Sequence, residues 1–147
     1  MIKITKLDHV AICVKNIDEA AKTYRALFGL EVDQREVVGS QRTEAALLPL
    51  GDSNLELISP AEALTATGER LPPNEGLQRF LEKRGPGLHH IALEVEGIEA
   101  ALTTLKSLGV PLIDETPRVG ARGHKVAFVH PKATGGLLVE LVEPMHE

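Results

Sequence analysis

The feature that most constrains this chain is an internal repeat. The segment Leu7-Asp8-His9-Val10-Ala11-Ile12 is similar to Gly87-Leu88-His89-His90-Ile91-Ala92, and His9 and His90 are 81 residues apart. Apolar residues that follow at helical spacing match at the same offset, as Ile17 does with Ile98. A period close to half the chain length indicates two copies of one supersecondary unit. Each copy therefore brings one histidine to the start of a strand.

The apolar spacing predicts one helix and four strands in each copy, in the order β-α-β-β-β. The predicted strands of the first copy are 7–14, 30–38, 43–50 and 55–58, and its helix is 17–28, with Asn16 or Asp18 as the N-cap. Those of the second copy are 88–95, 110–115, 125–130 and 137–142, and its helix is 98–108.

These elements predict one α+β domain over residues 1–147. It would consist of module 1 (about 5–58), a connector (about 59–86) with a short helix at 77–83, and module 2 (about 87–144). We expect the two modules to form a curved mixed sheet with the helices outside. If the paired sheets also enclose a metal site, the two histidines should lie within about 6 Å of each other, because metal–nitrogen distances are ~2.0–2.1 Å.

Composition excludes several classes of partner and location. The net charge of −5 provides no basic field for nucleic acid, and no apolar run approaches the ~20 residues that span a bilayer. The N-terminus lacks the apolar core of a signal peptide. The single cysteine, Cys13, excludes an intrachain disulfide and suits a reducing compartment. We therefore expect a cytoplasmic protein with no nucleic-acid or membrane partner.

Each module also places a glutamate in an apolar final strand, Glu56 in the first and Glu140 in the second. Charged residues are rarely buried unless they are paired or bind a metal. A single histidine or glutamate of this kind is more often structural, but two matched His/Glu pairs are harder to explain that way. Two imidazoles and two carboxylates make a mixed set of nitrogen and oxygen ligands, which suits Co²⁺, Mn²⁺, Ni²⁺, Zn²⁺ or Fe²⁺. The candidate ligands are His9, Glu56, His90 and Glu140. Two carboxylates would neutralise the ion, and an octahedral ion would keep two positions for substrate oxygens.

At these residues the chain resembles the vicinal oxygen chelate superfamily, which has the glyoxalase fold, and within it the methylmalonyl-CoA epimerases. The two histidine segments open the modules in the manner of that family. The stretch from Gly120-Ala121-Arg122-Gly123-His124 to Gly135-Gly136-Leu137-Leu138-Val139-Glu140-Leu141 resembles its C-terminal signature. The resemblance covers nearly the whole chain, and this last motif is its most specific part.

The resemblance implies a metal-dependent epimerisation of (2R)- and (2S)-methylmalonyl-CoA. The four residues His9, Glu56, His90 and Glu140 fall on the metal ligands, and cobalt and manganese are the usual metals of the family. Glu44 falls on the glutamate proposed as a catalytic base. The α-proton would leave and return through a metal-stabilised enolate. Because two faces of the carbon are involved, a second acid/base group is needed, and Glu140 is a candidate.

Two further expectations concern the substrate tail and the assembly. The coenzyme A phosphates require cationic contacts, for which the candidates are Arg118, Arg122 and Lys125, although a solvated loop is the plainer interpretation. Members of this family are commonly dimers, so we expect a homodimer.

Three other functions remain open on this fold. A glyoxalase I-type isomerase would use the same cage on a glutathione hemithioacetal. An Fe(II) extradiol dioxygenase would need two histidines and one carboxylate. A metal-free protein that sequesters drugs would need no ligands, and the four candidate ligands and the aromatic content of only 3% argue against it.

Overall fold

The computed structural model describes residues 2–145, which form two compact units. One unit combines Met1–Val10 with His90–Glu147, and the other is Ala11–His89. Their strands are β1 (Lys3–Cys13), β2 (Gln34–Val38), β3 (Thr43–Leu50), β4 (Ser53–Pro60), β5 (Ala63–Leu64), β6 (Arg70–Leu71), β7 (Gly87–Glu96), β8 (Arg118–Val119), β9 (Lys125–Val129) and β10 (Val139–Glu143). Their α-helices are α1 (Ile17–Phe28), α2 (Glu75–Arg84) and α3 (Ile98–Ser107).

The order of elements confirms the predicted duplication. The first copy is β1-α1-β2-β3-β4, and the second is β7-α3-β8-β9-β10. The compact units divide the chain differently from the copies, because most of β1 belongs to the unit that contains the second copy. His9 therefore lies in the same unit as His90.

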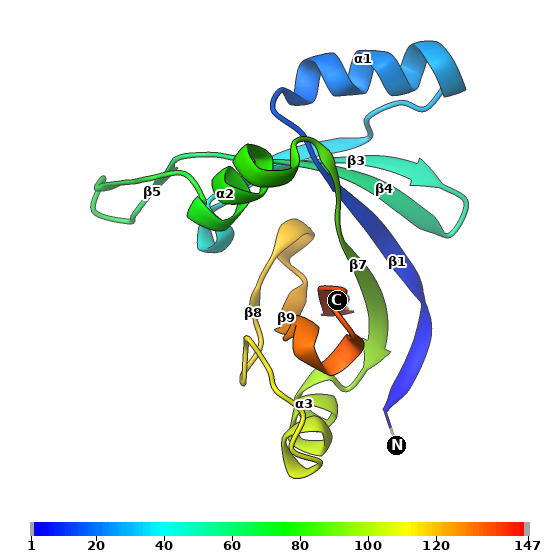
Figure 1. Cartoon of the computed structure of the whole chain (residues 1–147), viewed down its shortest axis with the longest axis vertical. Coiled ribbons are helices and arrows are strands. Elements are labelled where there is room, and N and C mark those ends of the chain that lie inside the picture. Colours follow the sequence, from blue (N-terminus) through cyan, green and yellow to red (C-terminus); the bar gives the residue numbers. More distant parts are fainter. Residues whose placement is uncertain (1, 146–147) are drawn as a thin grey trace. The chain divides into compact units, whose positions relative to one another are not determined.

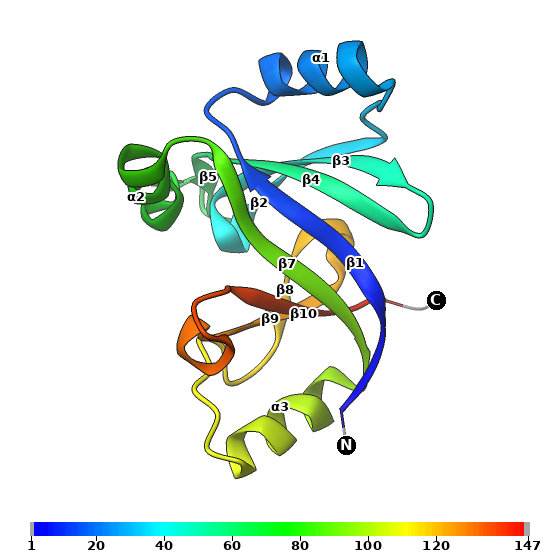
Figure 2. The ribbon, with the colours of Figure 1, turned by 45° about the vertical axis from the view of Figure 1, so that its right-hand side comes forward.

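The unit of Met1–Val10 and His90–Glu147 is built on five neighbouring strands, in the order β1-β7-β10-β9-β8 (Figures 1 and 2). Strand β10 runs parallel to β7, where Glu140 is opposite Ala92. It runs antiparallel to β9, where Glu140 is opposite Phe128. Side chains of β1, β7 and β10 that project from one face can therefore meet.

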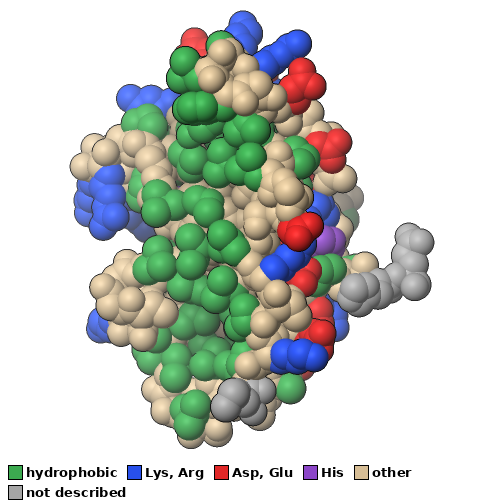
Figure 3. Space-filling view, turned by 90° about the vertical axis from the view of Figure 1, so that its right-hand side faces the viewer, with side chains coloured by type: hydrophobic (Ala, Val, Ile, Leu, Met, Phe, Trp, Pro, Cys, Tyr) green, Lys and Arg blue, Asp and Glu red, His purple; other side chains and the backbone are tan. Residues whose placement is uncertain are grey.

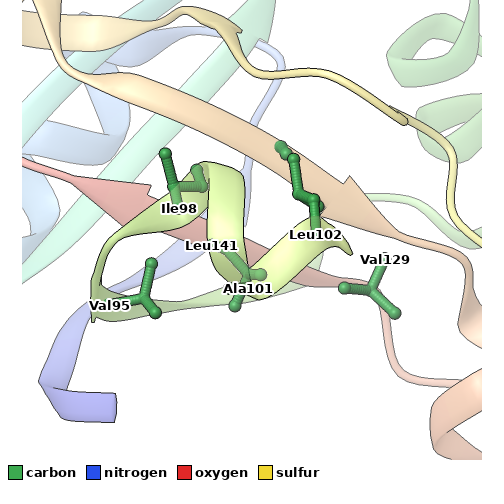
Figure 4. Close-up of a cluster of buried hydrophobic side chains, with 7 residues drawn as sticks. Val95, Ile98, Ala101, Leu102, Val129 and Leu141 are labelled. Atoms are coloured by element: carbon green, nitrogen blue, oxygen red, sulfur yellow. The ribbon is translucent and has the colours of Figure 1, made fainter. Parts of the chain in front are cut away.

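Helix α3 covers the hydrophobic core of this unit (Figure 4). Its buried positions, Ile98, Ala101 and Leu102, follow the predicted helical spacing and form one side of the helix. They pack with Val95 of β7 and Leu141 of β10. This packing holds β7 and β10 as a rigid support for the side chains on them.

The first turn of α3 is capped by a side chain from another strand. Gly97 precedes the helix and has no side chain with which to cap it. The Glu143 carboxylate of β10 instead accepts hydrogen bonds from the backbone N–H of Gly97 at 2.6 Å and of Ile98 at 3.1 Å. The negative charge also suits the positive end of the helix dipole.

The unit of Ala11–His89 contains the antiparallel strands β2, β3 and β4, covered by α1 (Figure 1). Asn16 caps α1 by accepting a hydrogen bond from the Glu19 backbone N–H, so the helix boundaries and one of the two predicted caps are confirmed. The buried residues Ala46, Leu48 and Leu57 pack with Ile17 and with other residues of α1. This contact identifies the α1-facing side of the sheet.

The connector is more structured than predicted. Its helix, α2, is longer than the expected 77–83 and is capped by Asn74, whose side chain accepts from the Leu77 backbone N–H. The short strands β5 and β6 pair before it. None of the helices in residues 2–145 is long and apolar enough to cross a membrane.

The predicted strand at 110–115 is wrong. Within this segment only Leu112 makes a β-bridge, to Val129, and the regular strand begins at Arg118. Pro111 has no N–H to give to a ladder. The backbone N–H groups of Ile113 and Asp114 both donate to the Phe128 carbonyl. Two residues of this segment are therefore opposite one residue of β9, and the regular strand register is lost. Similarly, β2 begins at Gln34 and not at residue 30.

We predict that Glu143→Ala lowers the free energy of unfolding by about 1–2 kcal/mol, because two N–H groups of the α3 N-terminus lose a charged acceptor. Urea denaturation followed by circular dichroism measures this change. Glu115→Ala, in the exposed segment after α3, is the matched control and should stay within about 0.5 kcal/mol of the wild type. Equal stability of the two variants would contradict the capping role.

Candidate metal centre

Three of the predicted ligands, His9, His90 and Glu140, come together within one compact unit. They lie on the three neighbouring strands β1, β7 and β10. Glu140 is opposite Ala92 in the parallel ladder, two residues beyond His90, and therefore projects from the same face as His90. The rings of His9 and His90 are 5.6 Å apart between centroids.

Both imidazoles approach one carboxylate oxygen. Glu140 Oε1 lies 3.1 Å from His9 Nε2 and 3.3 Å from His90 Nε2. All three side chains are about 95% buried. A ligand atom from each of the three residues lies within 4.8 Å of the other two.

Two effects on the Glu140 pKa oppose each other. Burial raises the pKa of this carboxyl, because the charged form loses its hydration. Hydrogen bonding and positive charge from His9 and His90 outweigh burial, so the pKa falls to about 2. The carboxylate therefore remains ionised at neutral pH and keeps its capacity as a metal ligand.

Asp8 is the next side chain outward from this cluster. Its Oδ2 atom is 2.7 Å from His9 Nδ1 and 2.8 Å from Arg122 Nη2. Burial raises the pKa of the Asp8 carboxyl. The hydrogen bond with His9 and the charge of Arg122 have a larger opposite effect, so this pKa falls to about 2. His9 is thus placed between two ionised carboxylates, one at each ring nitrogen.

The contacts of His9 determine what the cluster can bind. A neutral imidazole has one N–H, so it can donate to Asp8 or to Glu140 but not to both. The other nitrogen then presents its lone pair to a carboxylate oxygen, which is favourable only if a proton or a metal cation lies between them. Ligands ~2.0–2.2 Å from one ion lie roughly 3 Å apart, close to the spacings found at Glu140. Two imidazoles and a carboxylate therefore fit a divalent transition metal ion.

The fourth predicted ligand, Glu56, and the predicted base, Glu44, both lie in the unit of Ala11–His89. Glu56 is 5% exposed and is opposite Leu47 in the β3–β4 ladder. Glu44 lies on the same face of β3 as Ala46 and Leu48, which pack against α1. Glu56 alternates with Leu57 of that packed cluster, so Glu44 and Glu56 project from opposite faces of these strands.

Glu44 is part of a charged group near α1. Arg35 Nε lies 2.7 Å from Glu44 Oε2, and Arg35 Nη1 lies 2.5 Å from Asp18 Oδ1. The side chains of the two acids are 28% and 69% exposed, respectively. The position of Glu44 is therefore set by a guanidinium that also contacts the first turn of α1.

All three predicted phosphate contacts have acidic partners. Arg118 lies 3.5 Å from Asp114, Arg122 lies 2.8 Å from Asp8, and Lys125 lies 2.6 Å from Glu99. The Arg118 and Lys125 side chains are 37% and 43% exposed, whereas that of Arg122 is 21% exposed. Arg122 is therefore directed toward the interior more than the other two.

Sequence reasoning missed Asp8 and Phe128. The Phe128 ring lies 5.2 Å from the His90 ring in an edge-on contact, and the Arg118 guanidinium lies over the Phe128 ring, 5.7 Å from its centroid. The strand order alone could not have revealed the contact of Phe128 with His90. Asp8 did carry a signal, because an aspartate within an apolar strand beside a histidine needs a partner if it is buried.

We predict that His90→Ala abolishes tight binding of Co²⁺, because it removes one nitrogen from a set of three converging donors. Isothermal titration with Co²⁺ measures the loss. The matched control is His89→Ala, at the neighbouring position, where the histidine ring contacts Phe80. Wild-type affinity in His90→Ala would refute the assignment of this residue as a ligand.

Comparison with known proteins places this geometry in a family. Residues 8–128 match the model of the Glyoxalase/Bleomycin resistance protein/Dioxygenase superfamily. The chain is 40% identical to the uncharacterized protein YqjC of Bacillus subtilis, with coverage of 96% of this chain and 94% of that protein. It is 37% identical to the mitochondrial methylmalonyl-CoA epimerase of Dictyostelium discoideum, with coverage of 97% and 80%.

A solved structure supports the same relationship. A variant of Streptomyces coelicolor methylmalonyl-CoA epimerase in complex with 2-nitronate-propionyl-CoA superposes with a TM-score of 0.82. The two are 31% identical, and the match covers 96% of this chain and 95% of that one. The resemblance inferred from the histidine segments and the C-terminal signature is confirmed, as is the α+β glyoxalase fold.

Proposed function

The chain belongs to the Glyoxalase/Bleomycin resistance protein/Dioxygenase superfamily, within which it is related to the methylmalonyl-CoA epimerases, and on this premise we propose that it interconverts (2R)- and (2S)-methylmalonyl-CoA. The observation that carries the proposal is the buried His9–His90–Glu140 cluster in a chain with such relatives. The reaction removes the proton on the carbon α to the thioester and returns it on either face. An enolate forms between the two steps.

We assign His9, His90 and Glu140 as protein ligands of a divalent ion, with Co²⁺ or Mn²⁺ as our first expectation and Ni²⁺, Zn²⁺ or Fe²⁺ as alternatives. Such an ion would stabilise the negative charge that develops on the substrate oxygens. The protein's part is to hold the three donors in a site from which water is largely excluded. The side chains are about 95% buried, which strengthens every electrostatic contact inside the site.

Glu56 is proposed as the fourth ligand. It is a carboxylate in a buried position, and carboxylate oxygens join imidazole nitrogens as ligands of divalent transition metal ions. With Glu56 and Glu140 both ionised, the charge of a divalent ion would be balanced.

Glu44 is proposed as an acid/base group at the α-carbon. Arg35 holds this carboxylate on the α1-facing side of β3, the side opposite to that of Glu56, so the roles of Glu44 and Glu56 are tested separately below. Glu140 is retained as the candidate for the second proton transfer. Of the three candidate contacts for the coenzyme A phosphates, we propose Arg118 and Lys125, which are the more exposed; Arg122 is paired with the buried Asp8 at 2.8 Å.

A homodimer in the cytoplasm remains our expectation for the assembly and the location. Strand β1 exposes large apolar side chains, with Ile4 at 43% and Leu7 at 38%. Figure 3 shows hydrophobic side chains gathered over much of one face of the molecule. Contiguous exposed apolar surface favours association with another protein surface, and a second copy of this chain is the partner that we expect.

The activity is tested by incubating the Co²⁺-loaded protein with (2R)-methylmalonyl-CoA in D₂O. We expect deuterium at the α-carbon and the appearance of the (2S) epimer, measured by mass spectrometry and chiral analysis. His90→Ala in the same solution corrects for spontaneous exchange. If the loaded protein catalyses no exchange but converts the glutathione hemithioacetal of methylglyoxal, it is a glyoxalase I-type isomerase.

Variants of Glu44 and Glu56, the two glutamates proposed from the Ala11–His89 unit, distinguish the role of a base from that of a metal ligand. We predict that Glu44→Gln leaves Co²⁺ binding unchanged and slows epimerisation by ~10²–10⁴-fold, the usual effect of losing a positioned acid/base group. Glu56→Ala should instead weaken Co²⁺ binding. Glu36→Gln, an exposed position on the strand next to Glu44, is the control for the lost charge.

Steady-state rates and metal titrations on the same preparations decide between these roles. Epimerisation at the wild-type rate in metal-loaded Glu44→Gln would remove Glu44 from the mechanism. In that case the Arg35–Glu44–Asp18 group would have a structural role between β3 and α1.

A further inference from the structure

Asp8 and Arg122 form a charged pair directly outside the candidate metal centre. They are 114 positions apart in the chain, yet Arg122 Nη2 lies 2.8 Å from Asp8 Oδ2. The Asp8 side chain is only 3% exposed. The same Oδ2 atom lies 2.7 Å from His9 Nδ1. A carboxylate this deeply buried, with a histidine ring on one side and a guanidinium on the other, can act on the orientation of the ring.

The Asp8 contact selects which nitrogen of His9 is available. A carboxylate accepts hydrogen bonds and cannot donate them when ionised, so the hydrogen at Nδ1 must come from the imidazole. With its single hydrogen on Nδ1, a neutral imidazole presents the Nε2 lone pair. That atom is the one that faces Glu140 at 3.1 Å. Asp8 therefore favours the tautomer that can bind a metal ion at Nε2.

Arg122 is held in an uncommon backbone conformation. Its φ is 61° and its ψ is 16°, in the left-handed region that residues with a side chain adopt infrequently. The surrounding loop is closed by backbone hydrogen bonds from Gly120 to His124 at 2.9 Å and from Gly123 to Gly120 at 3.2 Å. Left-handed positions occupied by larger residues persist where the surroundings determine them, and they cluster at functional sites. The contact with Asp8 supplies a reason for an arginine at this position.

We infer that Asp8 and Arg122 are positioning residues of the metal centre: Asp8 fixes the ring and the tautomer of His9, and Arg122 fixes Asp8 and balances its charge. This inference rests on the proposed function only in that His9 is a metal ligand. It assigns Arg122 a role different from that of a phosphate contact. It also explains why a second carboxylate is buried next to the ligand set.

Metal affinity measures the role of Asp8 without reference to activity. Titration of Asp8→Asn with Co²⁺ should give a Kd ~10–100-fold higher than that of the wild type, the usual effect of removing the carboxylate behind a ligating histidine. Asp33→Asn, at an exposed position, is the matched control and should bind like the wild type. Thermal unfolding of the metal-free proteins establishes that both variants are folded.

The tautomer has its own spectroscopic readout. In the Zn²⁺-loaded wild type, we expect a slowly exchanging downfield proton resonance from Nδ1 of His9, because that hydrogen is bonded to a buried carboxylate. Asp8→Asn should move this resonance upfield. If Asp8→Asn is folded, binds Co²⁺ with the wild-type Kd and keeps the resonance unchanged, Asp8 has a structural role only and the inference fails.

Arg122 is tested with a pair of variants. Arg122→Gln should raise the Kd for Co²⁺ by about tenfold, since changes in the outer shell of a metal site have effects of this order. Arg122→Lys, which keeps the charge, should bind Co²⁺ more tightly than Arg122→Gln. The control is Arg25→Gln, because Arg25 is exposed and pairs with Glu31 at 3.3 Å. An unchanged Kd for Co²⁺ in Arg122→Gln, together with a raised KM for methylmalonyl-CoA, would make Arg122 a phosphate contact and overturn its positioning role.

These experiments separate the inference from the proposed activity. If the wild type binds Co²⁺, the Asp8 and Arg122 variants bind it more weakly, and no methylmalonyl-CoA exchange occurs, the positioning role stands and the activity is refuted. If the wild type binds neither Co²⁺ nor Zn²⁺, the positioning role is overturned together with the ligand assignment.

Discussion

A buried carboxylate that two imidazoles share is the interaction on which the site depends. Glu140 lies among side chains that are almost fully excluded from water, where an unbalanced charge would cost several kcal/mol. His9 Nε2 and His90 Nε2 both approach one of its oxygens, and this arrangement favours the ionised form when a proton or a metal cation lies between the nitrogens and the oxygen. Removing one partner from such a set leaves the remaining charges uncompensated. The charges of the three residues consequently depend on one another, as those of the ligands of one cation do.

The parallel pairing of β7 and β10 sets the position of Glu140 relative to His90. Glu140 is opposite Ala92, and the hydrophobic contacts of α3 with Val95 and Leu141 hold the same two strands together. A shift of one residue in this register would turn Glu140 to the other face of the sheet. The α3 core and the capping contact from Glu143 are therefore part of what keeps the metal ligands in position.

The duplication does not produce two equivalent halves. His9 and His90 are related by the repeat, but most of β1 belongs to the compact unit that contains the second copy. Glu44 and Glu56 also illustrate the difference, because their strand register directs them to opposite faces. A repeat sets the kinds and order of elements, whereas the pairing of strands sets which side chains can act together. The charged group of Glu44, Arg35 and Asp18 is a product of the α1-facing side alone.

Three properties can be read from the residues in order: the succession of elements in the two copies, the extent of α1, and the two histidines with Glu140 as unusual residues in apolar strands. These properties are readable because helical spacing, strand alternation and the cost of burying charge are local or compositional. Three others depend on the folded arrangement: Asp8 meets Arg122, Phe128 packs against His90, and 110–115 does not form a regular strand. Such contacts join distant segments, and their register depends on the competition of whole strands for partners, which no local pattern contains.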